Sequence, residues 1–265
     1  MNQKALYAVL LAILLPLTAY FIVKRKSEHT VLMPPHYLPD TVVEKVKKGK
    51  KVTDTVWHTV ADFSLVNQDN KTITWESLKG KIIIADFFFT RCPTICPTLT
   101  KNMKRLAESI HSGKRVGDKT NKKVHFLSFS IDPERDSVEK LKQWADRFQV
   151  NPETWWLLTG NKKMIYDLIF KELKIPVEDG YGVDTSFVHT DHFVLIDSNR
   201  HVRGYYHGLD SASLAKLSED LLMLTMEKGK NRKSFFEGKL ELIAIVFLAT
   251  ILGVGLLVYF FKKNK

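Results

Sequence analysis

The sequence predicts an α/β domain with a central mixed sheet and helices on both faces. Strand and helix patterns alternate from residue 57 to residue 227 of the 265-residue chain, and such alternation packs helices against a sheet. The two cysteines, Cys92 and Cys96, stand where an apolar strand pattern gives way to an amphipathic helix pattern. A β-α-β unit, then a helix, a hairpin and a final helix, with cysteines at that junction, predicts a thioredoxin-like fold.

The individual elements follow from their local patterns. Nearly continuous runs of aromatic and β-branched residues predict buried strands, and apolar residues repeated on one face predict helices. Shorter runs around a turn signal predict hairpins. We therefore expect a hairpin of residues 62–67 and 72–75, core strands at 81–90, 124–132 and 155–160, helices at 97–112, 137–148, 161–173 and 210–228, and a second hairpin of residues 192–197 and 202–208.

Two long apolar runs lie outside this domain. Residues 5–23 carry no charge and residues 240–261 carry one, and a membrane-spanning helix needs roughly 20 apolar residues. We expect a transmembrane anchor at 5–23 and a second transmembrane helix at 240–261. A cleaved signal peptide is the alternative for the first run, although the basic residues KRK follow it where a small-residue cleavage site would be needed. The remaining segments are a linker at 24–56, the domain at 57–227 and a basic linker at 228–239.

The excess positive charge lies outside the predicted domain. The formal net charge is +11, but residues 57–227 hold 23 Lys plus Arg and 23 Asp plus Glu. A domain without a basic excess is not expected to bind nucleic acid. The basic residues beside the apolar runs favour anionic lipid surfaces. They do not settle which side of the membrane the domain occupies, because a long loop can be translocated regardless of its charge.

Cys92 and Cys96, in the stretch DFFFTRCPTICPT, allow three kinds of site: a structural disulfide, a redox pair or two metal ligands. A helix N-terminus stabilises a thiolate, which disulfide exchange and metal binding both require. A disulfide across four residues closes a small loop and stabilises little. Two thiolates favour copper(I) or zinc over magnesium or calcium, so a metal site needs a third ligand. Of the nine histidines, His189 and His192 stand at the entry to a predicted strand, where the chain can meet the cysteine loop.

Three further polar residues bear on the thiols. Asp86 lies inside a predicted buried strand, six residues before Cys92, which is the offset of the buried aspartate in thioredoxins. Such a carboxyl would have a raised pKa and exchange protons with the thiols, unless this side of the strand meets solvent or a partner. Asp132 and Arg135 follow a core strand in the run IDPERD. Asp132 and Arg135 could form a turn or an ion pair that helps to position the ligands without binding the metal. The alternative is a purely structural role.

The joint pattern resembles a known family. DFFFTRCPTICP, SFSIDPERDS and a histidine six residues before the leucine of FVLID are together similar to the Sco/SenC family of membrane-anchored, thioredoxin-like copper-binding proteins. The resemblance implies that Cys92, Cys96 and His189 bind copper. His192 does not have the offset of the family histidine and is kept as the second choice for the third ligand. The chain departs from the family pattern in two places. Val188 stands where an acidic residue usually precedes the histidine, and a second apolar run follows the domain.

The same resemblance implies a function. The protein would be a copper metallochaperone that helps to assemble the CuA centre of cytochrome c oxidase, by delivering copper or by keeping the cysteines of that centre reduced. Its partners would be the copper-bearing subunit of the oxidase and a thiol reductant. The domain would lie on the extracytoplasmic side of the inner membrane, where an oxidising compartment lets the pair cycle between dithiol and disulfide.

Other kinds of function remain open at this point. Zinc fits the same ligands, but it normally takes four ligands or a water in the fourth position. An enzyme is the main alternative: a membrane-anchored thiol-disulfide oxidoreductase or peroxidase that uses Cys92 and Cys96 without metal. A redox or copper sensor, with the second apolar run contacting a membrane partner, is a third hypothesis.

Overall fold

The computed structural model describes the folded domain and part of the chain around it. The described residues are 14, 17, 18, 21, 22, 33–47, 50–112, 123–175, 190–227 and 255. The chain divides into two compact units, residues 1–226 and residues 227–265. All the elements named below belong to the first unit.

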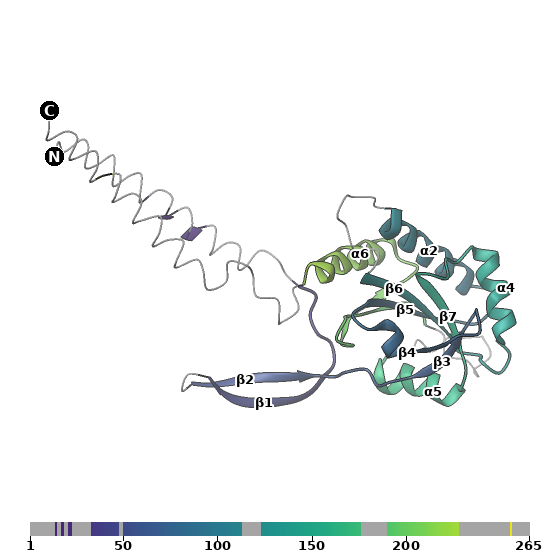
Figure 1. Cartoon of the computed structure of the whole chain (residues 1–265), viewed down its shortest axis with the longest axis horizontal. Helices are drawn as coiled ribbons and strands as arrows, with labels where there is room; N and C mark the ends of the chain where they lie inside the picture. The colour runs from purple at the N-terminus through teal and green to yellow at the C-terminus, as the bar shows by residue number, and fades with distance from the viewer. Residues whose placement is uncertain are drawn as a thin grey trace. The chain divides into compact units, whose positions relative to one another are not determined.

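A seven-stranded mixed sheet forms the centre of the domain, in the order β4-β3-β7-β6-β5-β8-β9 (Figure 1). Its strands are β3 (Ser64–Asn67), β4 (Thr72–Thr74), β5 (Ile82–Phe88), β6 (Val124–Ser130), β7 (Trp155–Thr159), β8 (His192–Ile196) and β9 (Val202–His207). β5, β6 and β7 are parallel, whereas β3 with β4 and β8 with β9 form antiparallel pairs. The predicted mixed sheet and both predicted hairpins are confirmed.

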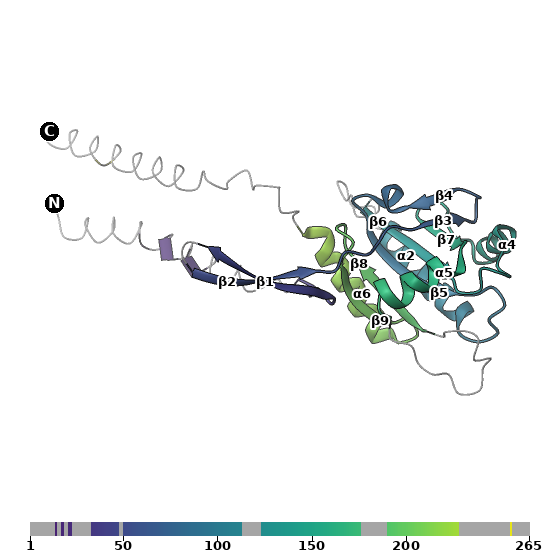
Figure 2. The same cartoon turned by 90° about the horizontal axis from the view of Figure 1, so that it is seen from below.

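Helices cover both faces of this sheet. α2 (Cys96–Ser112), α4 (Val138–Phe148) and α6 (Ser211–Met226) lie along one face, and α5 (Lys162–Asp167) lies along the other (Figure 1 and Figure 2). The crossovers β5-α2-β6 and β6-α4-β7 put α2 and α4 on the same face, because parallel crossovers are right-handed. One π-helical turn, η2 (Leu168–Glu172), continues α5, and a short 3-10 helix, η1 (Trp75–Leu78), follows β4. Asp210 caps α6 as expected, since its carboxylate accepts a hydrogen bond from the amide of Ser213 at 2.8 Å.

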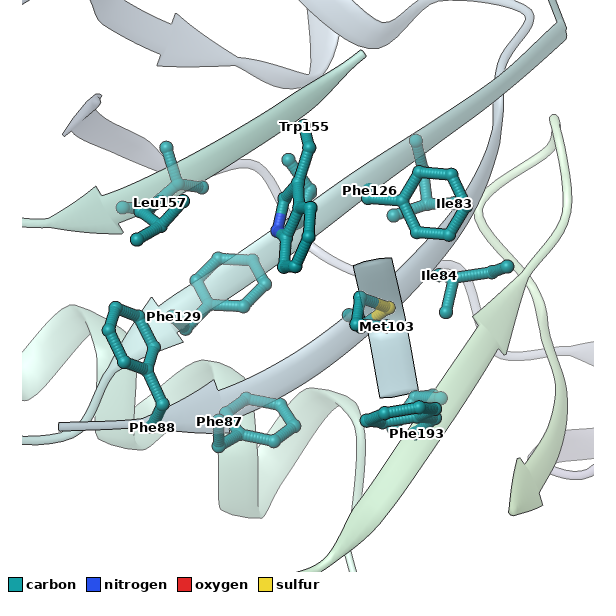
Figure 3. Close-up of a cluster of buried hydrophobic side chains, with 14 of the residues drawn as sticks. Ile83, Ile84, Phe87, Phe88, Met103, Phe126, Phe129, Trp155, Leu157 and Phe193 are labelled. Atoms are coloured by element: carbon teal, nitrogen blue, oxygen red, sulfur yellow. The ribbon is translucent and has the colours of Figure 1, made fainter. Parts of the chain in front are cut away.

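The core follows from the central strands. Every residue of β5, β6 and β8 is buried, as expected for strands whose two faces are both covered. Figure 3 shows part of this core, in which side chains from β5, β6, β7 and β8 gather around Met103 of α2. The cysteine loop therefore follows β5, a strand that is packed on both of its faces.

A β-hairpin occupies most of the segment expected to be a linker. β1 (Pro39–Lys47) and β2 (Lys50–Trp57) pair antiparallel, with Glu44 opposite Thr53. The sequence interpretation assigned no strand there. The many lysines obscured a run of β-branched residues, which favour strands. Val42, Val43 and Val56 are exposed, so these positions show no alternation of buried and exposed residues.

The two apolar runs fall largely outside the described residues. Of residues 5–23 the structure describes five, all helical and exposed: Leu14, Leu17, Thr18, Phe21 and Ile22. Of residues 240–261 it describes Gly255. Within the described part of the chain, no helix is both long enough and apolar enough to cross a membrane.

Candidate functional site

The two thiols sit where β5 ends and α2 begins, as predicted. The backbone amide of Cys92 donates to the carbonyl of Phe89 at 3.2 Å, so the chain turns directly after the strand. Cys96 is the first residue of α2, and its amide donates to the Sγ of Cys92 at 3.5 Å. Both cysteines are free thiols and both are buried. The start of the helix thus presents its first amide to the neighbouring sulfur.

The two thiols have opposite pKa shifts. The S–H of Cys96 donates to the sulfur of Cys92, and the amides of Cys96 and Thr94 add to this, so the pKa of Cys92 falls from 9.0 to about 4 in spite of burial. The same hydrogen bond, together with burial, raises the pKa of Cys96. Cys92 is therefore the thiolate at neutral pH and Cys96 keeps its proton, as expected beside the amides of a helix start.

Asp86 is buried within β5, opposite Ser128 of β6. Burial raises its pKa from 3.8 to about 7, against the lowering effect of the hydrogen bond from Ser128. Among the described residues, Oδ1 of Asp86 has no hydrogen-bond partner. Its charge also raises the pKa of Cys96. The alternative in which this side of the strand meets solvent is wrong, and Asp86 is a buried carboxyl that interacts electrostatically with Cys96.

Asp132 is buried directly after β6 and contacts the cysteine loop. Its Oδ2 lies 2.9 Å from Nη2 of Arg91, the residue before Cys92, and 3.7 Å from Nη1 of Arg135. The expected ion pair between Asp132 and Arg135 is present, but the shorter one runs to Arg91. The IDPERD loop thereby holds the residue next to Cys92.

Asp136, which the sequence interpretation missed, connects the same two loops more extensively. Its carboxylate accepts hydrogen bonds from the amide and the hydroxyl of Thr90, at 3.1 and 2.5 Å, and from the hydroxyl of Ser130 at 2.6 Å. A fully buried carboxylate with three donors fixes the position of Thr90, two residues before Cys92. The one sign of it in the sequence is its place immediately before the Ser137 helix cap.

The predicted third ligand, His189, lies outside the described residues, which resume at Thr190. β8 begins at His192 and runs antiparallel to β5, with Val194 opposite Ala85. The start of β8 therefore lies toward the carboxyl end of β5, where the cysteine loop leaves the sheet. Thr190 is buried there, so the chain that enters β8 reaches the same edge of the sheet as the thiols.

A hollow of about 300 Å³ opens beside the cysteine loop. Four of its lining side chains are cationic, Arg91, Arg135, Lys140 and Arg147, and none of its lining residues is acidic. The guanidinium of Arg147 also lies over the ring of Phe148, 5.3 Å from its centroid. This charge favours an anionic group on whatever molecule approaches the thiols.

Comparison with known proteins adds to this geometry. The SCO1/SenC family model matches residues 52–223. The SCO1 protein homolog of Bacillus subtilis is 32% identical over 174 residues, which make up 65% of this chain and 86% of that relative. A relative from Stutzerimonas stutzeri that is named for copper binding is 28% identical over 148 residues, 55% of this chain and 68% of its own length.

A solved structure supports the same assignment. BsSco, described as a member of the Sco family of cytochrome c oxidase assembly proteins in which a disulfide switch was identified, is 30% identical to this chain. The match covers 66% of this chain and 98% of BsSco, with a TM-score of 0.55. The thioredoxin-like α/β fold predicted for the domain is confirmed by this likeness together with the observed sheet order.

Proposed function

This chain belongs to the SCO1/SenC family, and we propose that it binds copper through Cys92, Cys96 and His189 and helps to assemble the CuA centre of cytochrome c oxidase. The observation that carries the proposal is the pair of buried free thiols at the junction of β5 and α2, one of them a thiolate at neutral pH. Family membership supports cytochrome c oxidase as the recipient of the copper, since the relative BsSco is described as a cytochrome c oxidase assembly protein.

The donor atoms suit copper. Thiolates are soft ligands that select copper(I) and zinc over magnesium and calcium. The sulfurs of Cys92 and Cys96 are within hydrogen-bonding reach of each other, which places them close enough for one ion to contact both. Cys96 must give up its proton when the ion binds, whereas Cys92 has already lost its own. Two thiolates and an imidazole leave an open side from which the ion can pass to a recipient.

The place of His189 in the chain supports its role as the third ligand. It is bonded to Thr190, and neighbouring Cα atoms are about 3.8 Å apart. Thr190 is buried where the chain enters β8, at the edge of the sheet from which the cysteine loop departs. His189, one residue before Thr190, is therefore the third ligand in this proposal.

An anaerobic copper(I) titration of the full-length chain in detergent tests the proposal. We expect tight binding of an equimolar amount of copper, weakened in Cys92→Ser, Cys96→Ser and His189→Ala. His201→Ala is the matched control, because His201 lies next to β9 at the opposite end of the β8–β9 hairpin. Weak binding that does not depend on His189 would contradict the proposed ligand set.

A second function from another class, thiol-disulfide exchange, is favoured by the different acidities of the two thiols. The thiolate of Cys92 would attack one sulfur of a partner disulfide to form a mixed disulfide, and the other partner sulfur would leave as a thiolate and take up a proton. Cys96 would then lose its proton and attack the sulfur of Cys92. This breaks the mixed disulfide and releases the remaining partner sulfur as a thiolate, which also takes up a proton. The partner gains two electrons, and Cys92 and Cys96 end as a disulfide. Asp86, with a pKa of about 7, is a suitable acceptor for the proton of Cys96.

One variant separates the two functions. His189→Ala should weaken copper binding and leave disulfide reduction intact, because exchange needs only the two sulfurs. Loss of both activities in His189→Ala, with an unchanged melting temperature, would argue against exchange as an independent function.

The proposed location follows from the proposed chemistry. The domain would lie outside the cytoplasm, held at the inner membrane by residues 5–23 and 240–261, because an oxidising compartment suits a pair that cycles through a disulfide. Its partners there would be the copper-bearing subunit of the oxidase and a thiol reductant. The cationic hollow beside Cys92 would favour an acidic surface on the recipient.

A further inference from the structure

A second cluster of metal-ligating side chains lies on the β8–β9 pair. His192, the first residue of β8, and His207, the last of β9, are directly opposite each other in the antiparallel register. Directly opposed residues project to the same face, and the centroids of these two imidazole rings are 4.3 Å apart. Asp191 precedes His192 and reaches both rings. We propose that Asp191, His192 and His207 form a binding site for a divalent transition-metal ion, separate from the thiol site.

The distances between the donor atoms fit a single ion. Oδ1 of Asp191 lies 3.1 Å from Nδ1 of His192, and Oδ2 of Asp191 lies 3.2 Å from Nδ1 of His207. The ligand atoms of the three residues all lie within 4.8 Å of one another. A tetrahedral ion with bonds of about 2.0–2.2 Å holds its ligand atoms roughly 3.3–3.6 Å apart. The ion can therefore take the place of the hydrogen bonds with small movements of the side chains.

The donor set indicates which ions the site would take. Two imidazoles and a carboxylate are ligands of borderline and hard character, which suit zinc(II), cobalt(II) and copper(II). The thiolates of Cys92 and Cys96 prefer the softer copper(I). The two sites would thus differ in the ions that they bind, although both lie at the end of the sheet where β5 stops.

The backbone around the cluster is fixed by hydrogen bonds and close packing. The amide of Gly208 donates to the carbonyl of Asp191 at 2.7 Å, and the amide of His207 donates to the hydroxyl of Ser213 at 2.8 Å. A Cβ at Gly208 would lie 2.6 Å from the side chain of Leu99, so α2 packs directly against this strand end. Ligands held by rigid elements lose little entropy when they bind an ion.

The cluster is also open to an incoming ion on one side. The side chain of His192 is 9% exposed, that of Asp191 is 20% exposed, and that of His207 is 53% exposed. Two ligands are therefore held inside the fold while the third faces solvent. A water or an exchanging ligand could occupy the fourth position, as in zinc sites that remain accessible.

A comparable cluster at the opposite end of the same hairpin is a poorer candidate. His36, Asp197 and His201 also bring their ligand atoms within 4.8 Å of one another. There, however, Oδ2 of Asp197 lies 2.9 Å from the guanidinium of Arg203. A cation would have to displace this buried partner. Asp191, by contrast, makes no ion pair with a lysine or arginine within the part of the chain that the structure describes.

The test is a cobalt(II) titration of the untagged full-length chain in detergent, in a Cys92→Ser, Cys96→Ser background that removes the thiol ligands. We expect an equimolar amount of cobalt(II) to bind with the visible absorption of a tetrahedral nitrogen and oxygen site. His207→Ala and Asp191→Asn should each weaken binding by about tenfold or more. His201→Ala should leave it unchanged, and competition by zinc(II) should remove the absorption.

Three outcomes would overturn the proposal: no cobalt(II) binding in this background, binding that survives His207→Ala, or binding that His201→Ala removes. If the double-serine background does not fold, the same ion is titrated into the chain with its cysteines intact. The number of cobalt(II) ions bound should then fall by one in His207→Ala. Because His207 is half exposed, this variant should retain the melting temperature of the parent. The result does not depend on copper binding at the cysteines, so the two proposals can fail separately.

Discussion

The S–H of Cys96 donates a hydrogen bond to the sulfur of Cys92, and its removal should have a measurable effect. Cys96→Ala deletes the S–H donor that contributes most to the low pKa of Cys92. We expect the pKa of Cys92 to rise and its alkylation by iodoacetamide at about pH 6 to slow by roughly tenfold, because the thiolate is the reactive form. Cys96→Ser is the control, since its hydroxyl still donates. Equal rates in the parent chain and Cys96→Ala would show that the helix amides alone lower the pKa.

Asp86 makes the stability of the domain depend on pH. Its pKa is raised in the folded state from 3.8 to about 7, so the folded state binds this proton more tightly than the unfolded state does. The resulting stability is complete below the unfolded pKa and is lost as the pH rises through about 7. Fully developed, the loss is about 4 kcal/mol, at 1.36 kcal/mol for each pKa unit.

The measurement must separate Asp86 from the cysteines. The lowered pKa of Cys92 acts in the opposite sense, since it adds stability as the pH rises above about 4. We therefore compare the free energy of unfolding of the parent chain and Asp86→Asn at about pH 5 and pH 8. Relative to the parent chain, Asp86→Asn should have a higher free energy of unfolding at about pH 8 than it has at about pH 5. The exposed Asp146→Asn is the control, and a parallel pH dependence of the parent chain and Asp86→Asn would contradict the expected shift.

The loop before α2 and the loop before α4 are joined through Asp136. Asp136→Asn weakens the buried hydrogen bonds to Thr90 and Ser130, and we expect it to cost about 1–3 kcal/mol of unfolding free energy. Because Thr90 is two residues before Cys92, copper(I) affinity should also fall by about 10- to 100-fold, the usual effect of residues that orient ligands.

The control for Asp136→Asn comes from the same loop. Glu134 is exposed and pairs with Lys162 at 3.0 Å, so Glu134→Gln should change neither quantity. Reduced stability with unchanged copper affinity would mean that Asp136 supports the fold without positioning the cysteine loop.

The distribution of charge and apolar residues over the complete chain bears on its place in the cell. The domain carries no net charge, and the basic excess lies beside the apolar runs. We expect protease to cut the domain in right-side-out membrane vesicles and to spare it in inside-out vesicles, because an oxidising compartment suits the proposed chemistry. Vesicles opened with detergent provide the control, since the domain should then be cut in both. The reverse pattern would place the domain in the cytoplasm.

Much of the fold could be predicted from local patterns. A buried strand and an amphipathic helix each impose a fixed spacing on apolar residues, so the positions of β5, α2, β6 and α4 could be read along the chain. The position of Cys92 and Cys96 at a strand-to-helix junction followed from the same spacing. The β1–β2 hairpin could not be predicted in this way, because Val42, Val43 and Val56 are all exposed and do not show the alternation of buried and exposed residues that marks a strand.

The features that depend on contacts between distant residues required the folded structure. Thr90 and Asp136 are 46 residues apart, and their hydrogen bonds exist because β5 and β6 pair in parallel with one particular register. The burial of Asp86, and hence its raised pKa, depends on what packs over that position of the strand. Asp191, His192 and His207 come together because β8 and β9 pair from end to end. Local spacing specifies each element, whereas register and packing between elements determine which side chains meet.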